Sequence, residues 1–289
     1  MGPSRITHSA SDEDDGSARW RLPSGTPMLR RSLCSLAQPC LMKAQRTPRF
    51  LFHDATVLLV AAGRIDLDDT VQQLTVDTPS SLLLVEANTS AHLVKTPGGV
   101  EQRFRSIFLT LPSTLLETFH RTRTPTQMDK ERTPSFRQVL LDDDLTSTLQ
   151  HVLASVDAQR VSDERLQYRL MDLLAALAER GSLFQQSPLN SASRRLRTLI
   201  SEAPEQQWTA REAGRALAMS EATLRRRLSD ERTRFEDLLI DVRMHHALML
   251  LQTTSFHISD ISQACGYKSR ARFAERFHAR FGYLPSAVR

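Results

Sequence analysis

The sequence predicts an α+β protein that consists of an N-terminal β-domain with helices and a C-terminal all-α domain with two helix-turn-helix units. Three observations support this prediction. Short apolar runs broken by Gly, Pro, Asp and Asn fill residues 46–112. Apolar residues at helical spacing dominate most of the chain after them, and one two-helix pattern occurs twice near the end. We expect a disordered tail over 1–45, the β-domain with its helices over 46–180, a linker over 181–193 and the helical domain over 194–289.

The first 45 residues lack the periodicity of a helix or a strand. They mix Ser, Gly, Pro, scattered Arg and the acidic run Asp12 to Asp15. This composition is typical of a disordered segment. The stretch from Met28 resembles a signal peptide only faintly, because it is internal and its apolar run is short. The sequence leaves open whether translation starts at Met1, Met28 or Met42.

Six short apolar runs predict the strands of the β-domain. They are Phe50 to Phe52, Thr56 to Ala62, Gln72 to Val76, Ser81 to Glu86, Ala91 to Lys95 and Phe104 to Leu111. Such runs, separated by turn residues, indicate a small antiparallel barrel or sandwich. His53, Glu86, His92 and His120 lack the close His-x-His spacing of a metal-dependent enzyme of this shape. We therefore expect neither a metal site nor a cofactor.

Two helices should follow these strands. Residues from Phe136 to Val156 have helical spacing, and Asp163 to Arg180 is clearer because Ser162 can cap its start and Gly181 can end it. The second helix carries an apolar stripe, formed by Leu166, Leu170, Leu173, Leu174 and Leu177. The simplest interpretation is that the stripe covers the β-domain. The composition of residues 181–193 is that of a flexible linker.

The repeated two-helix pattern is the most informative feature of the chain. It first runs from Thr209 to Leu228 and then from His257 to Phe277. The equivalent positions pair Ala213 with Ile261, Leu217 with Cys265, Met219 with Tyr267, Leu224 with Phe273, and Leu228 with Phe277. Each pattern also has start signals: Thr209 and Glu212 form a predicted capping box, while Ser220 and Ser269 precede the second helix of each unit. The sequence therefore predicts two helix-turn-helix units.

A long helix over Arg234 to Gln252 should connect the two units. Its length is about 28 Å at 1.5 Å per residue. Successive turns of one DNA major groove lie about 34 Å apart. The helix therefore has about the length needed to hold two recognition helices in neighbouring windows of the groove.

The run from Arg234 onward resembles the DNA-binding domain of AraC/XylS-type bacterial transcription regulators, over about residues 194–289. The positions that match the family pattern are Ala213, Ser220, Leu224, Phe235, Arg243, Ala247, Asp260, Ile261, Gly266, Phe273, Phe277, Phe281, Gly282, Pro285 and Arg289. The resemblance implies a cupin-like β-barrel with helices before this domain, which senses an effector or mediates dimerisation. It also implies that the helix with the leucine stripe can form a homodimer seam through Leu166, Leu170, Leu173 and Leu177.

Charge supports DNA binding independently of the resemblance. Residues 190–289 hold 17 Arg and Lys against 11 Asp and Glu, a net charge of +6, whereas residues 1–189 hold 21 against 22, a net charge of −1. The excess positive charge therefore lies wholly in the helical domain. Such a distribution favours a phosphate-rich partner.

The helical geometry indicates which side chains would meet DNA. Leucines 224 and 228 and phenylalanines 273 and 277 should face the core, which turns other residues outward. The expected base contacts are Ala222, Arg225, Arg226, Arg270, Ala271, Arg272, Ala274 and Glu275. The expected phosphate contacts are Ser220, Lys268, Ser269, Arg276 and Arg280, with helix capping or simple surface charge as the alternative.

The sequence as a whole predicts a cytoplasmic activator that binds double-stranded promoter DNA and contacts RNA polymerase. Its effector, a small molecule or a protein, is not identified by any motif. The three cysteines form neither a disulfide framework nor a zinc pattern, no apolar stretch could cross a membrane, and no catalytic motif occurs. Two alternatives stay open: a regulator controlled by a protein partner, and a cupin-type enzyme fused to a DNA-binding domain.

Overall fold

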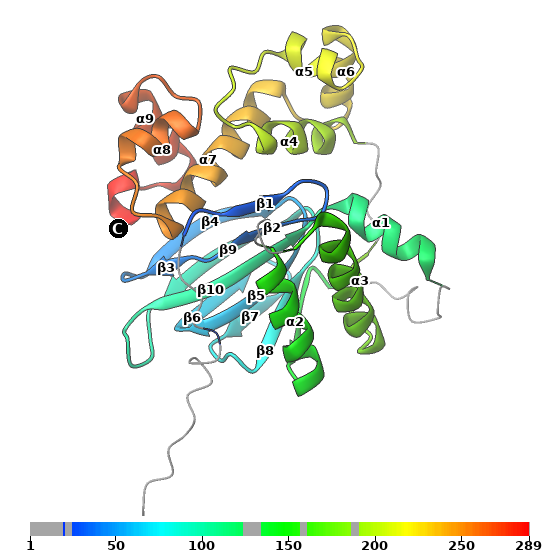
Figure 1. Ribbon diagram of the computed structural model, residues 1–289. Coiled ribbons are helices and arrows are strands. Elements are labelled where there is room, and N and C mark those ends of the chain that lie inside the picture. Colours follow the sequence, from blue (N-terminus) through cyan, green and yellow to red (C-terminus); the bar gives the residue numbers. More distant parts are fainter. Residues whose placement is uncertain (1–19, 21–24, 124–133, 157–160, 186–190, 289) are drawn as a thin grey trace, which may run out of the picture.

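The computed structural model describes residue 20 and residues 25–123, 134–156, 161–185 and 191–288. Figure 1 shows a β-domain with helices α1 to α3 at one side and a group of C-terminal helices, α4 to α9, lying across another side. The predicted α+β class is confirmed. Parts of the predicted tail and linker and the terminal Arg289 lie outside the described residues.

The β-domain contains two antiparallel sheets. The larger follows the order β1 (Met28–Arg30), β2 (Cys34–Ala37), β10 (Phe104–Leu111), β5 (Ala55–Ala62), β8 (Ser81–Val85) and β11 (Phe136–Leu140), with β3 (Cys40–Leu41) also pairing with β10. The smaller follows the order β4 (Gln45–Phe52), β9 (Thr89–Thr96), β6 (Arg64–Asp68) and β7 (Gln73–Val76). Hydrogen bonds between described strands do not join the two sheets, so the arrangement is a sandwich and not a closed barrel.

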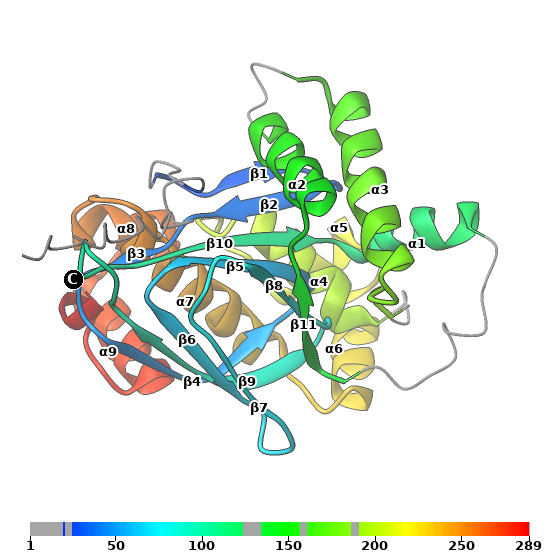
Figure 2. The ribbon, with the colours of Figure 1, turned by 90° about the horizontal axis from the view of Figure 1, so that it is seen from below.

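Each face of the larger sheet packs against a different layer (Figure 2). On β5, Val57 and Leu59 belong to a core shared with α1 (Ser113–Thr122), α2 (Asp143–Ser155) and α3 (Asp163–Glu179). Leu58 and Val60 instead belong to the core between the two sheets. This alternation follows from the two-residue period of a strand. Both faces are covered, which explains why β5 is apolar from Val57 to Ala62.

The prediction of a disordered tail is wrong for residues 25–45. Strands β1, β2 and β3 lie there and pair with each other and with β10. Leu33, Cys34 and Leu36 are buried in the core that faces the helices. The strands were missed because they hold only two to four residues each and stand among Arg and Ser. Strands β2 and β3 are stabilised by pairing with β10, which follows more than 60 residues later in the chain, and β1 is stabilised by pairing with β2.

The helix predicted from Phe136 to Val156 is also partly wrong. Its first five residues form strand β11, which pairs with β8, and helix α2 begins only at Asp143. Asp142 caps α2 by accepting a hydrogen bond from the Leu145 amide. Phe136 is buried between the sheets. The backbone of its strand is stabilised by hydrogen bonds to β8, and the spacing of apolar residues within this segment contains no information on that partner.

The leucine stripe of α3 lies inside the β-domain. Leu166, Leu170, Leu173 and Leu177 are all 0% exposed within one chain and share a core with the larger sheet. Ser162 caps the helix, and Gly181 follows its end with a positive φ of 65°. The stripe therefore covers the sheet. A homodimer seam on this helix would have to use other residues, such as the exposed Tyr168.

The C-terminal domain contains the two predicted helix-turn-helix units. Its helices are α4 (Ala192–Glu202), α5 (Ala210–Ala216), α6 (Glu221–Asp230), α7 (Phe235–Thr253), α8 (Ile258–Ala264) and α9 (Arg270–Phe281), followed by a 3-10 turn over Pro285–Val288. Helices α5 and α6 form the first unit, α8 and α9 form the second, and α7 connects them (Figure 1). No helix in the described ranges is both long and apolar enough to cross a membrane.

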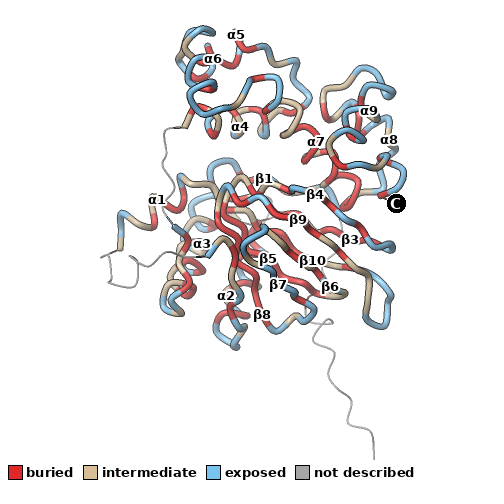
Figure 3. Tube along the Cα trace, turned by 180° about the vertical axis from the view of Figure 1, so that it is seen from behind, coloured by how far each residue is buried: buried red, intermediate tan, exposed pale blue. Residues whose placement is uncertain are grey.

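The two domains share buried surface (Figure 3). Met244, Leu248 and Leu251 of α7 belong to the same apolar cluster as Phe50 of β4 and Phe108 of β10. Helix α7 is therefore buried on several sides, which differs from a helix that only separates two DNA-binding units. Its contact with the β-domain therefore helps to fix where the second helix-turn-helix unit lies relative to the sheets.

Candidate nucleic-acid interface

Local capping fixes where the two candidate recognition helices begin. The Ser220 hydroxyl accepts from the Thr223 amide at 3.1 Å, and the Ser269 hydroxyl accepts from the Arg272 amide at 3.4 Å. In the first unit, Thr209 and Glu212 form the predicted capping box at the start of α5. Ser220 and Ser269 thus act as helix caps in this structure. Contact of either hydroxyl with phosphate stays a prediction.

The turn of each unit contains a residue in the left-handed region. Ala218 has a φ of 57° in the first unit, and Gly266 has a φ of 75° in the second. The two positions are equivalent, since Met219 and Tyr267 follow them directly. A Cβ at Gly266 would also lie 2.9 Å from the carbonyl oxygen of Pro204. The second turn therefore requires glycine, whereas the first tolerates alanine with some backbone strain.

Helix α6 presents the predicted face to solvent. Leu224 and Leu228 are 0% exposed, whereas Ala222, Arg225 and Arg226 are exposed. The guanidinium of Arg225 bonds two carboxylates: its Nε lies 3.0 Å from Glu221 and its Nη1 lies 3.1 Å from Glu236. The expected base-reading group is therefore held by two acidic neighbours.

Helix α9 also exposes most of its predicted contact residues. Phe273 and Phe277 are 0% exposed, and Ala274 is half-buried between them. The expected contacts that lie on the exposed surface are Arg270, Ala271, Arg272, Glu275 and Arg276, and Lys268 is exposed in the preceding turn. All of them are therefore accessible to a partner of the second unit.

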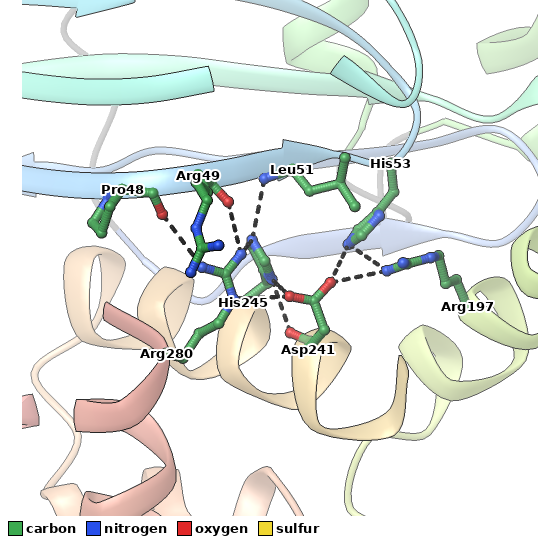
Figure 4. A network of polar contacts seen from close by, with 8 residues as sticks. All are labelled: Pro48, Arg49, Leu51, His53, Arg197, Asp241, His245 and Arg280. Atoms are coloured by element: carbon green, nitrogen blue, oxygen red, sulfur yellow. Dashed lines mark hydrogen bonds and ion pairs between the residues drawn. The ribbon is translucent and has the colours of Figure 1, made fainter. Parts of the chain in front are cut away.

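Arg280 is bound within the protein instead of being a free surface cation. Its Nε donates to Asp241 at 2.9 Å, and its Nη2 donates to the carbonyl of Arg49 at 2.8 Å (Figure 4). A further bond at 3.3 Å reaches the carbonyl of Pro48. The structure therefore places this predicted phosphate contact between the domains. No local sequence signal could identify it, because Pro48 and Arg49 lie about 230 residues away in the sequence.

Asp241 is the centre of this contact between the domains. Arg197 of α4 donates to one carboxylate oxygen at 2.9 Å, and Arg280 of α9 donates to the other. Burial alone would raise the pKa of Asp241, but the side-chain contacts with His245 and Arg197 and the positive charge around the carboxylate have the larger effect and hold this pKa well below its usual range. The carboxylate is therefore ionised and paired over the physiological pH range.

Three side chains in this contact have the donor types that metals bind. One nitrogen or oxygen from each of His53, Asp241 and His245 lies within 4.8 Å of the others. Both oxygens of Asp241 are already bonded by Arg197 and Arg280, so two guanidinium groups supply the compensating positive charge. In this structure the cluster is held together as an ion-pair network.

A buried lysine forms a second polar link between the domains, which the sequence did not indicate. Lys95 of β9 is 2% exposed, and its ammonium donates to Gln252 of α7 at 2.8 Å. It also lies 4.8 Å from the ring centroid of Phe108. Gln252 in turn bonds Gln45, and Gln45 donates to the Tyr283 hydroxyl at 3.2 Å.

Burial lowers the pKa of Lys95 to about 7, and burial is the single cause of this shift. No described carboxylate therefore compensates its charge. A buried ammonium without a counter-ion is costly, and such groups are often placed for a ligand or a functional transition. The alternation of β9 reveals an inward lysine only when the register of the sheet is known.

Comparison with known proteins shows what kind of domain the C-terminal helices form. Residues 213–289 match a family model described as a helix-turn-helix domain. The virulence regulon transcriptional activator VirF of Shigella flexneri is 31% identical over 121 residues, which cover 41% of this chain and 46% of VirF. The urease operon transcriptional activator of Escherichia coli is 36% identical over 91 residues, covering 32% of this chain and 31% of that protein. The chain thus matches less than half the length of these relatives.

Solved structures of ToxT from Vibrio cholerae resemble the whole chain. The structure with an unsaturated fatty acid bound superposes with a TM-score of 0.58 at 16% identity, covering 92% of this chain and 96% of ToxT. The structure with a naphthalenyl butenoic acid bound gives a TM-score of 0.58 at 14% identity, covering 88% of this chain and 97% of ToxT. At this identity the comparison shows that the two proteins share a fold.

Proposed function

Because its C-terminal domain belongs to the AraC/XylS family of DNA-binding regulators, we propose that this chain is a sequence-specific transcription activator controlled by its N-terminal domain. The relatives named above are transcription regulators, and the proposal gives the chain no catalytic role. It would act in the cytoplasm, bind promoter DNA and contact RNA polymerase.

One observation carries the DNA-binding proposal. Two helices, α6 and α9, each expose arginines beside a buried apolar stripe, and the 19-residue helix α7 separates them. Arginine suits base reading because its planar group can bond both the O6 and the N7 of guanine. We assign base reading to Ala222, Arg225, Arg226, Arg270, Ala271, Arg272, Ala274 and Glu275, and phosphate contacts to Lys268 and Arg276.

Mapping the genomic fragments that the full chain occupies in its host, followed by binding to one such fragment, tests this proposal. Affinity should fall steeply with salt, with a log–log slope of about −4 or steeper if about five phosphates are engaged. The preferred fragment should bind at least about a thousandfold more tightly than an unrelated duplex at the same salt. Equal affinity for both duplexes would overturn sequence-specific binding.

We further propose that the effector is a small amphipathic molecule with one carboxylate, and that Lys95 binds that carboxylate. The support is the buried ammonium without a counter-ion, set against the rings of Phe104 and Phe108 at the contact with α7. ToxT, which shares the fold, has been solved with molecules of this chemical class. The carboxylate of such a molecule would compensate the charge of Lys95. The apolar part of the molecule would replace some of the side-chain packing between the sheets.

Thermal unfolding with a monounsaturated fatty acid tests this assignment. The acid should raise the Tm of the parent protein, and its methyl ester, which lacks the charge, should not. Lys95→Met keeps the length of the side chain and should abolish the response. An equal response to acid and ester, or an unchanged response in the variant, would favour the alternative in which a protein partner controls the regulator. Affinity capture of such a partner with the full chain would then be the next experiment.

A further inference from the structure

Two histidines between the domains are held in their neutral form by their hydrogen-bond partners. Arg197 donates to Nε2 of His53 at 3.2 Å, and the Leu51 amide donates to Nε2 of His245 at 3.4 Å (Figure 4). Guanidinium groups and backbone N–H groups can only donate, so each Nε2 must carry a lone pair and no proton. Nδ1 of His245 then carries the proton and donates to the backbone carbonyl of Asp241 at 2.8 Å.

The surroundings of these histidines are already rich in positive charge. Asp241 is the carboxylate that bonds Arg197 and Arg280, and Arg280 also lies 3.5 Å from Nε2 of His245. His53 and His245 face each other with ring centroids 5.4 Å apart. The half-buried Asp54 follows His53 in the chain, and burial raises the pKa of its carboxyl while the charge of Arg194 opposes this shift. Nε2 of His53 also lies 3.6 Å from Asp241, which would attract a protonated ring. This carboxylate is already paired with Arg197 and Arg280, and a proton on Nε2 would face the Arg197 guanidinium in place of the present hydrogen bond.

We propose that His53 and His245 form an acid-sensitive latch, which holds α4, α7 and α9 on the β-domain at neutral pH and releases them when the medium is acidified. The latch joins three helices of one domain to strand β4 and the loop after it. Its opening would free the second helix-turn-helix unit while the first unit keeps its own core. The latch would thus make the freedom of the second helix-turn-helix unit depend on the acidity of the medium.

The direction of the effect follows from proton linkage. Burial lowers the pKa of His53 well below its ordinary value, and the charge of Arg197 lowers it further. The open state takes up a proton on His53 near pH 6.5, whereas the closed state does not. The contribution of His53 to closure should therefore be constant above about pH 6.5, and below it should lower the ratio of closed to open molecules about tenfold per pH unit.

Lys95 acts in a different pH range and does not obscure this effect. Its pKa is lowered to about 7 in the closed state, so its contribution to closure changes between about pH 10.5 and pH 7 and is constant at lower pH. A comparison that starts at pH 7.0 and moves to pH 5.5 therefore reports on the histidines. The calculated pI of about 9.5 means that the protein carries increasing positive charge over this range, which favours solubility.

Small-angle X-ray scattering of the full chain tests the latch, with far-ultraviolet circular dichroism recording that both domains remain folded. The radius of gyration of the parent protein should increase between pH 7.0 and pH 5.5. The double variant His53→Gln, His245→Gln keeps a hydrogen-bond acceptor at each site but cannot take up a proton, so it should remain compact. His278→Gln, which changes an exposed histidine of α9, should respond as the parent does.

Asp241→Asn removes the central carboxylate and should give the expanded form already at pH 7.0. A folded parent protein that stays compact down to pH 5.5 would overturn the proposal. The same conclusion would follow if the double variant expanded over the same pH range as the parent. If the double variant is expanded at neutral pH, the single variant His53→Gln decides the matter. It should be compact at pH 7.0, and between pH 7.0 and pH 5.5 its ratio of closed to open molecules should fall about tenfold less than that of the parent.

Discussion

The two helix-turn-helix units repeat one sequence pattern but have different neighbours. The first unit has a core of its own with α4 and α7, which includes Leu224 and Leu228. The second is continuous with the β-domain, because rings follow one another from Phe277 through Phe281 and His245 to Phe50 at centroid distances of 4.8, 5.9 and 4.9 Å. Two units with the same sequence pattern therefore differ in how freely each can move relative to the β-domain. The β-domain can act directly on the second unit and reaches the first mainly through α4 and α7.

Removing one buried side chain at equivalent positions would give the largest effect. Phe277→Ala should destabilise the protein by about 3–5 kcal/mol and Leu228→Ala by about 2–5 kcal/mol, because both leave cavities in packed cores. The sites of lost order should differ. Hydrogen exchange should accelerate in both the second unit and strand β4 for Phe277→Ala, but only in the first unit for Leu228→Ala. Equal acceleration in β4 for both variants would contradict the separation of the two cores.

Exchanging the residues at the two turns should give opposite effects of intermediate size. Gly266→Ala should destabilise the second unit by at least about 1–2 kcal/mol, because alanine disfavours the left-handed backbone and its Cβ would approach the Pro204 carbonyl. Ala218→Gly should stabilise the first unit by less than about 1 kcal/mol, since the strain it relieves is offset by greater freedom of the unfolded chain.

Denaturant unfolding of both turn variants measures this difference. The two changes have opposite signs if the turns are equivalent in backbone conformation and differ only in their residue. A loss of stability in both variants would show that Ala218 contributes packing that outweighs its backbone strain.

Releasing Arg225 from its acidic partners should have the smallest effect. Glu236→Gln removes one of the two ion pairs of Arg225 and should strengthen DNA binding by up to about fivefold, since exposed ion pairs contribute about 0–1 kcal/mol. Asp237→Asn changes the charge of the same exposed helical turn and provides the matched control. An equal gain in both variants would indicate a general charge effect and not a specific hold on Arg225.

The predictions from sequence succeeded where the determining contacts are local. The caps at Ser162, Ser220 and Ser269 each involve an amide three residues away, and the repeated apolar spacing correctly located both helix-turn-helix units. Five of the six predicted strands match observed strands within a few residues at each end, because their apolar runs are long enough to bury one or both faces. The run at Phe50 to Phe52 located only the end of a longer strand.

The failures concern contacts between distant segments. Strands β1 to β3 depend on pairing with β10, and Arg280 depends on carbonyl groups that lie in β4. Likewise, Lys95 and Asp241 become unusual only when α7 is placed on the β-domain. Periodicity and charge within one segment contain no information on these partners.

The central claim is that α6 and α9 read separate halves of one DNA site. Selection of bound sequences from a random duplex library tests it, using the parent and the two double variants Arg225→Ala, Arg226→Ala and Arg270→Ala, Arg272→Ala. We expect the parent to select two half-sites centred about 10 base pairs apart, and each variant to lose about 1–3 kcal/mol per bidentate contact and to lose preference in its own half alone. Identical preferred sites for all three proteins would contradict the claim.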